Sequence, residues 1–243
     1  MRSIDTEQSS NLNTYAIFNG TSEENALRHF YRLGGNDAKA LWSGTVYAEW
    51  HDVMPYMADV SDHPAFLNWE QQEAPDDWGI IVTTQDTFEN VFKHFRSLTQ
   101  VWMPASGHVF FRFYDPRFSL NVAQYCNDEQ RCDLMGPCIS WNAKNRLVTN
   151  TTPSPFLSEK PFPWWDVPKD VVKKISLDKS VLAMNLVKGL AGEREDIYLS
   201  YPEKILEYKA TRFVNRYEGN DQSYLANFII QLEEEQQRLG YTR

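Results

Sequence analysis

The stretch FFRFYDPRF, residues 110–118, holds four side chains whose types and spacing could do chemistry: Arg112, Tyr114, Asp115 and Arg117. A carboxylate can act as a general base, and a nearby guanidinium can hold an anion. These residues could therefore form the active site of a small hydrolase or transferase, with Asp115 as the base and Arg112 or Arg117 as the anion holder.

The same residues also fit a structural role. Arg112 can pair with a carboxylate, Asp115 can cap the next helix, and Pro116 suits the first turn of that helix. Buried arginine pairs and helix caps are much commoner than active sites, and this favours the structural interpretation. Three interpretations stay open: an active site, a partner-binding surface, or an ionic cluster that organises the lobe.

The rest of the sequence contains no other recognisable catalytic or metal-binding pattern. It has no GxSxG, no HExxH and no glycine-rich phosphate loop. Its five histidines are scattered, and Cys126, Cys132 and Cys138 lack the spacing of a zinc site. We therefore expect a protein that is not an enzyme, with no catalytic residues, no metal and no cofactor.

Two adjacent tryptophans, Trp164 and Trp165, lie in the proline-rich segment PFPWWD at residues 161–166. Tryptophan is a favoured hot-spot residue at protein interfaces, so the pair could be an exposed anchor for a partner. The pair could equally hold two lobes of the protein together, and both interpretations stay open.

The elements around the FRFYDPR stretch predict how its side chains are held. Residues 78–84 are a short apolar run typical of a buried strand, and residues 108–114 are β-branched and aromatic like a second strand. A capping box at residues 86–89 begins an amphipathic helix between them. This order predicts an α/β (or α+β) lobe with a mostly parallel sheet flanked by helices.

A strand over residues 108–114 would point Arg112 and Tyr114 to the same face, because side chains alternate along a strand. Asp115 would follow at the carboxyl end of that strand. Ligands tend to bind beyond the carboxyl ends of strands in α/β sheets, so we expect a polar site at this edge of the sheet.

The composition changes after residue 150, which predicts three parts. Residues 1–150 form the α/β lobe, and residues 151–168 form a linker rich in proline and aromatic residues. Residues 169–243 carry apolar residues at helical spacing and predict an all-helical lobe.

The 243-residue chain is acidic, with 24 Lys and Arg against 33 Asp and Glu and a formal charge of −9. An acidic surface repels phosphate groups, so we expect no nucleic-acid partner and no binding to anionic membranes. No apolar run approaches the roughly 18 residues of a membrane span. The first residues carry no apolar secretory segment, so we expect a cytoplasmic protein.

Several motifs follow one another within residues 15–142: Leu41-Trp42 with Tyr47, PYMADV at 55–60, WGIIVTT at 78–84, Phe88 with HFR at 94–96, FRFYDPR at 111–117, and Gly136-Pro137. In this order they resemble the type VI secretion effector chaperones, also called adaptors of the Tap/TEC/VasW-like kind. FRFYDPR is the most specific of these motifs.

The resemblance implies a non-catalytic cytoplasmic protein that binds a secreted effector and helps to load it onto the spike protein VgrG. The resemblance places the family's conserved stretch on Arg112, Tyr114, Asp115, Pro116 and Arg117. It fits two roles for these residues, contact with the cargo or organisation of the lobe. The family's C-terminal part is variable, which fits cargo choice. Besides the enzyme described above, an immunity-type inhibitor, which also acts by binding, stays open.

Overall fold

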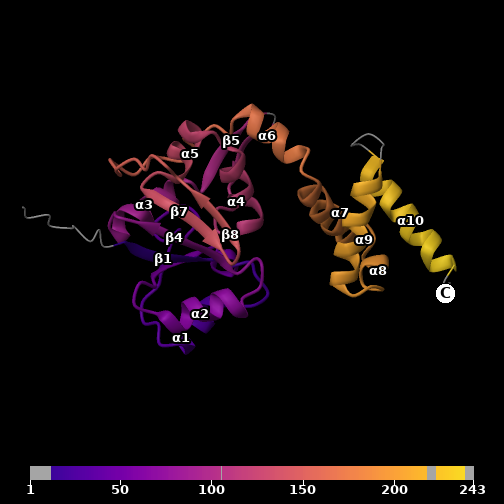
Figure 1. Ribbon diagram of the computed structural model, residues 1–243, viewed down its shortest axis with the longest axis horizontal. Helices are drawn as coiled ribbons and strands as arrows, with labels where there is room; N and C mark the ends of the chain where they lie inside the picture. Colours follow the sequence, from indigo (N-terminus) through magenta and orange to yellow (C-terminus); the bar gives the residue numbers. More distant parts are fainter. Residues whose placement is uncertain (1–11, 105, 218–222, 239–243) are drawn as a thin grey trace, which may run out of the picture. The chain divides into compact units, whose positions relative to one another are not determined.

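A computed structural model describes residues 12–104, 106–217 and 223–238 of the chain (Figure 1). The chain divides into two compact units, residues 1–171 and residues 172–243. Each unit has its own core, and each is described separately below.

The first unit is built around a six-stranded sheet with the strand order β2-β3-β1-β4-β7-β8. Its strands are β1 (Asn13–Phe18), β2 (Lys39–Ala40), β3 (Tyr56–Asp59), β4 (Gly79–Thr84), β7 (Cys138–Ala143) and β8 (Arg146–Thr149). A separate hairpin pairs β5 (Gln100–Met103) with β6 (Gly107–Phe110). All the paired strands named here are antiparallel, so the unit is α+β and the predicted mostly parallel sheet is wrong.

The prediction of a parallel sheet failed because of two features, the burial of β4 and the path of the chain after it. Five of the six β4 residues are buried, because helices cover both faces of the sheet. A continuous apolar run of this kind is typical of parallel sheets, but any sheet covered on both faces produces it. The helix after β4 leads into β5, which belongs to the separate hairpin and not to the sheet. The strand that pairs with β4 on the side away from β1 is β7, and it runs antiparallel to β4.

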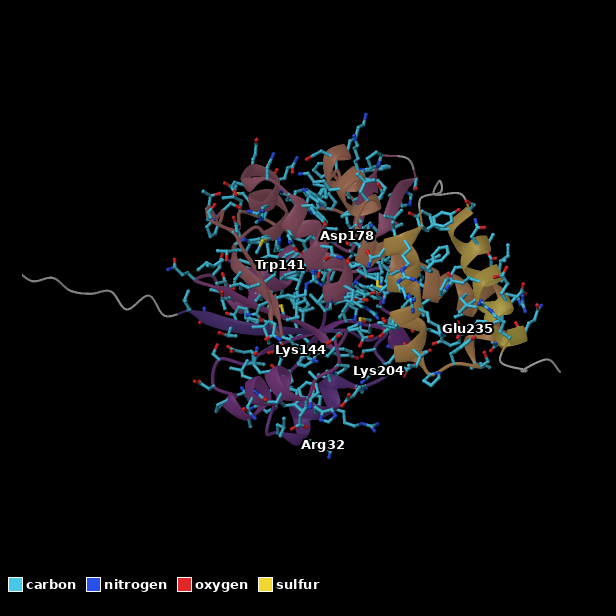
Figure 2. The ribbon with its side chains drawn as sticks, turned by 45° about the vertical axis from the view of Figure 1, so that its right-hand side comes forward. Arg32, Trp141, Lys144, Asp178, Lys204 and Glu235 are labelled. Atoms are coloured by element: carbon cyan, nitrogen blue, oxygen red, sulfur yellow. The ribbon has the colours of Figure 1, made fainter. Side chains whose placement is uncertain are left out.

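Helices lie on both sides of this sheet (Figure 1). The helices of the first unit are α1 (Ala26–Arg32), α2 (Pro64–Gln72), α3 (Phe88–Ser97), α4 (Pro116–Tyr125) and α5 (Asp128–Met135), with a short 3₁₀ helix, η1 (His51–Val53). Helices α1 and α2 cover one face, where Phe18 of β1 packs with Phe30 and Phe66. On the other face, Trp141 of β7 is fully buried with its ring 5.4 Å from that of Phe95 of α3 (Figure 2).

The predicted strand over residues 108–114 is shorter than expected. Strand β6 ends at Phe110, and the backbone then turns twice. The Phe113 N–H donates to the Phe111 carbonyl at 2.8 Å, and the Asp115 N–H donates to the Arg112 carbonyl at 3.0 Å. The predicted alternation of side chains therefore does not extend to Arg112, and Asp115 does not follow the carboxyl end of a parallel strand.

The proline-rich segment packs onto the first unit. The Trp102 N–H of β5 donates to the Trp165 carbonyl, and the Val167 N–H donates to the Trp102 carbonyl, both at 2.9 Å. Arg96, near the end of α3, donates from Nε to Glu159 Oε1 at 2.6 Å. Residues 151–168, expected as a linker, thus lie in the compact unit that extends to Val171.

The described residues of the second unit are mainly helical. Helix α6 (Lys169–Ser176) crosses the boundary between the units, and α7 (Lys179–Glu193), α8 (Glu195–Tyr198), α9 (Glu203–Arg216) and α10 (Tyr224–Arg238) follow. Their core contains Leu190 of α7, Leu206 of α9 and Phe228 of α10, all fully buried. No helix among the described residues is both long and apolar enough to cross a membrane.

Candidate functional site

Asp115, the only carboxylate of the FRFYDPR stretch, is fully buried. It is the N-cap residue of α4, and its Oδ1 accepts the backbone N–H of Arg117 at 3.1 Å. Pro116 occupies the first turn of the helix, where a missing N–H costs nothing. These contacts are the ones that the structural interpretation of the stretch expects.

Two guanidinium groups bind the Asp115 carboxylate. Arg117 donates from Nε to Oδ1 and from Nη2 to Oδ2, both at 2.9 Å, in a bidentate pair. Arg112 Nη2 lies 3.0 Å from Oδ2. A buried carboxylate needs such partners, because an unpaired charge is costly to remove from water.

The pairing extends to two other parts of the chain. Arg117 Nη2 lies 3.2 Å from Oδ2 of Asp77, in the loop before β4. Arg112 Nη2 donates to Thr21 Oγ1 at 3.0 Å, in the loop after β1. We call Arg112, Asp115, Arg117 and Asp77 the ion cluster. Its two positive and two negative charges balance, and it joins the start of α4 to two loops at the end of the sheet.

Tyr114 connects the ion cluster to a group of aromatic side chains. The residue is buried, and its ring lies 6.2 Å from that of Trp42. Burial raises the pKa of the Tyr114 hydroxyl above its ordinary value, and the positive charge of Arg112 partly opposes that rise. Tyr114 therefore stays neutral and packs as an aromatic residue beside the cluster.

A group of aromatic side chains that are only partly buried packs against Trp42. We call Tyr47, Trp50, Phe110 and Phe162 the aromatic face. The Trp50 and Phe110 rings stack at 5.2 Å, and the Tyr47 ring lies 4.8 Å from Phe110. Trp50 is 47% exposed and Phe110 is 38% exposed. Large rings of this kind, adjacent and in contact with water, are typical of a protein-binding surface.

The hairpin extends the same face. Gln100 pairs with Phe110 and Trp102 pairs with His108 across β5 and β6, so these side chains share one face of the hairpin. The Trp102 ring is 42% exposed and meets the edge of His108 at 5.7 Å. Gln100 Nε2 donates to the Tyr47 hydroxyl at 2.8 Å and fixes that ring in the aromatic face.

The two tryptophans of the proline-rich segment have different environments. Trp165 is buried, with its ring 6.3 Å from that of Phe111. Trp164 is half-buried, and the Lys160 ammonium lies 3.6 Å from its ring centre. Both contacts are made within the first unit.

Among the described residues, no group of three or more His, Cys, Asp and Glu side chains could hold a metal ion. The ion cluster has only two carboxylates, and both are already paired with arginines. The carboxylates of the ion cluster are therefore engaged in ion pairs within the protein.

The sequence pattern indicated three members of the ion cluster, Arg112, Asp115 and Arg117, but neither Asp77 nor the aromatic face. Tyr47 lies within a motif of the family resemblance and Phe110 directly precedes another, yet neither motif shows that these side chains are exposed. The available signal was the aromatic residues close together in one short segment, Trp42, Tyr47 and Trp50. The sequence does not show that Phe162 comes to lie 6.0 Å from Tyr47.

The fold and site define an α+β unit with a paired ionic cluster and an exposed aromatic face, followed in the chain by a helical unit. Residues 14–133, just under half of the chain, match the model of a family described as "Domain of unknown function (DUF4123)". The matched segment contains the whole ion cluster and most of the aromatic face. No curated protein and no solved structure matches the chain.

Proposed function

We propose that this protein is a cytoplasmic adaptor that binds a secreted effector of a type VI secretion system and helps to load it onto the spike protein VgrG. Two findings support the proposal. The motifs of residues 15–142 resemble the effector chaperones, and residues 14–133 match the DUF4123 family, which is associated with type VI effector adaptors.

The observation that carries the proposal is the aromatic face. Trp50 and Phe110 stack on one another and remain substantially exposed, whereas Trp42 beside them is almost fully buried. Tryptophan and tyrosine are the residues that most often dominate binding energy at interfaces, with about 2 kcal/mol or more lost on truncation of a hot spot. We infer that the effector contacts this face.

In this account the ion cluster has an organising role. It holds the chain from Arg112 to Arg117 in the turn that places Phe110 on the aromatic face and Tyr114 beneath it. Its carboxylates are already paired, so it offers a partner little beyond the exposed edges of its arginines. The recognition surface would then lie beside the FRFYDPR stretch.

We also propose that the protein acts by binding and has no catalytic activity. A general base must reach a substrate proton at hydrogen-bond distance. Asp115 is buried, and both of its oxygens already accept hydrogen bonds from arginines. An enzyme that used Asp115 would have to break these pairs before it could act, which argues for binding over turnover.

The proposal is tested by affinity purification from the host at native expression, followed by mass spectrometry and size-exclusion chromatography. The expected result is one large effector near one-to-one stoichiometry, with or without the spike protein. A monomer with no effector, under conditions in which the secretion system is made, would contradict the proposal. An immunity-type inhibitor would instead be recovered with a toxin whose activity it blocks.

A further inference from the structure

The second unit carries a groove of its own. It lies between α9 and α10 and has a volume of about 950 Å³. One wall is a stripe of α9 residues. The other is formed by residues of α10 that include Gln231 and Glu235, of which Glu235 is labelled in Figure 2. The groove is formed by the helical unit alone.

The α9 wall has an apolar half and a basic half. Ile205, Tyr208, Arg212 and Arg216 are spaced by three, four and four residues, which places them on one face of the helix. Ile205 and Tyr208 are 45% and 64% exposed, which is unusual for residues lining the seam between two packed helices. From Ile205 to Arg216 the stripe is about 16 Å long, or three helical turns.

The charge of the groove differs from that of the whole chain. Lys209 Nζ donates to Glu235 at 2.7 Å, so this lysine is already paired. Among the described residues, no carboxylate pairs with Arg212 or Arg216. Both are exposed and lie one turn apart, where like charges repel each other. An acidic chain of net charge −9 thus presents a locally basic groove.

We propose that this groove binds an amphipathic α-helix of a protein partner, with apolar residues on one face and a carboxylate pair along its flank. The apolar half of the stripe would take the partner's side chains at positions i, i+3, i+4 and i+7, as in other complexes of a helix in a groove. Carboxylates four residues apart on the partner would face Arg212 and Arg216, which are themselves four residues apart.

The inference rests on the proposed function in one respect, because it takes the helix to be a segment of the cargo effector. Charge complementarity selects an acidic helix over a basic one, since a basic helix would add repulsion at Arg212 and Arg216. The exposed apolar half selects a folded amphipathic segment over a purely acidic extended peptide, which would leave Ile205 and Tyr208 uncovered.

A direct test uses the full chain and a fluorescein-labelled peptide of roughly 18 residues, with leucines at i, i+3, i+4 and i+7 and glutamates four residues apart on one flank. A second peptide carries lysine in place of each glutamate. Fluorescence anisotropy measures both affinities at low and high salt. The protein variants are Arg212→Glu with Arg216→Glu, and a matched control, Lys179→Glu with Lys188→Glu, in which two exposed α7 lysines outside the groove undergo the same change of charge.

The acidic peptide is expected to bind with a Kd of roughly 100 μM or tighter, and the lysine peptide at least about tenfold more weakly. The Arg212/Arg216 variant should lose about tenfold in affinity for the acidic peptide, while the control pair stays within about twofold. Circular dichroism checks that all variants fold. No binding of the acidic peptide, or equal binding by the Arg212/Arg216 variant, would overturn the inference.

The same variants separate this inference from the proposed function. Effector recovery that is normal with the Arg212/Arg216 variant would overturn the groove as a cargo site and leave the adaptor function standing. Peptide binding as expected, together with no effector in the purification, would contradict the adaptor function and support the groove as a helix-binding site.

Discussion

The Asp115 carboxylate is fully buried and lies 3.0 Å from the guanidinium of Arg112, three residues earlier in the chain. The same Arg112 nitrogen donates to Thr21, and its guanidinium lies 5.0 Å from the ring of Phe118. This pair therefore joins a loop, a turn and the first turn of a helix.

Replacing Asp115 by Asn should lower the free energy of unfolding by about 2–3 kcal/mol. The asparagine keeps an oxygen for the N-cap but leaves Arg112 and Arg117 without their carboxylate. The partial exposure of both arginines makes the loss smaller than for a fully buried pair. Urea unfolding measures the change.

Asp128→Asn is the matched control for this experiment. Asp128 also pairs with an arginine, Arg131, at 3.0 Å, but its side chain is 74% exposed. A surface pair of this kind contributes less than about 1 kcal/mol. Equal losses in the two variants would show that the ion cluster does not organise the fold.

His94 should make the protein less stable in weak acid. Burial lowers its pKa to about 4, although its contact with the Leu134 carbonyl partly opposes the shift. Between about pH 6.5 and pH 4 the unfolded chain binds a proton that the folded chain does not. The free energy of unfolding should therefore fall as the pH falls through this range, with a contribution from His94 of up to about 3 kcal/mol.

The His94 contribution can be isolated by comparing pH dependences. A His94→Leu variant should lose less stability than wild type between pH 7 and pH 4.5 in urea unfolding, whatever its stability at pH 7. His51→Leu, which changes an exposed histidine, should keep the wild-type dependence. The same pH dependence in wild type and His94→Leu would contradict the prediction.

Trp165→Ala should destabilise the first unit by about 3–4 kcal/mol, because it empties a buried site against Phe111. Trp164→Ala should cost only about 1 kcal/mol, since that ring is half-buried and mainly loses its contact with Lys160. Chemical unfolding of the two variants measures both. A larger loss from Trp164 than from Trp165 would reverse this assignment of their roles.

The local chemistry of the FRFYDPR stretch could be predicted, because N-capping and a proline in the first helical turn act between neighbours in sequence. The amphipathic helix predicted to begin at residues 86–89 likewise forms, as α3. The partners Thr21 and Asp77 could not be predicted, because they reach the stretch only after β1 and β4 have paired in the sheet.

The direction of the strands could not be predicted from hydrophobic pattern alone. The buried run of β4 shows that both faces are covered and does not show how its neighbours run. The aromatic face was hidden for a related reason. Trp42 and Trp50 are both tryptophans in one short segment, yet Trp42 is almost fully buried and Trp50 is exposed. That difference is set by tertiary packing.

The most direct test of the central claim compares effector recovery by wild type with recovery by a Trp50→Ala, Phe110→Ala variant expressed at the native level. Tyr31→Ala is the control, because Tyr31 is a similarly exposed aromatic residue, on α1. The account predicts at least about a tenfold loss of effector for the double variant, with normal folding, and no loss for the control. Undiminished recovery by a folded Trp50/Phe110 variant would contradict the claim that the aromatic face binds the partner.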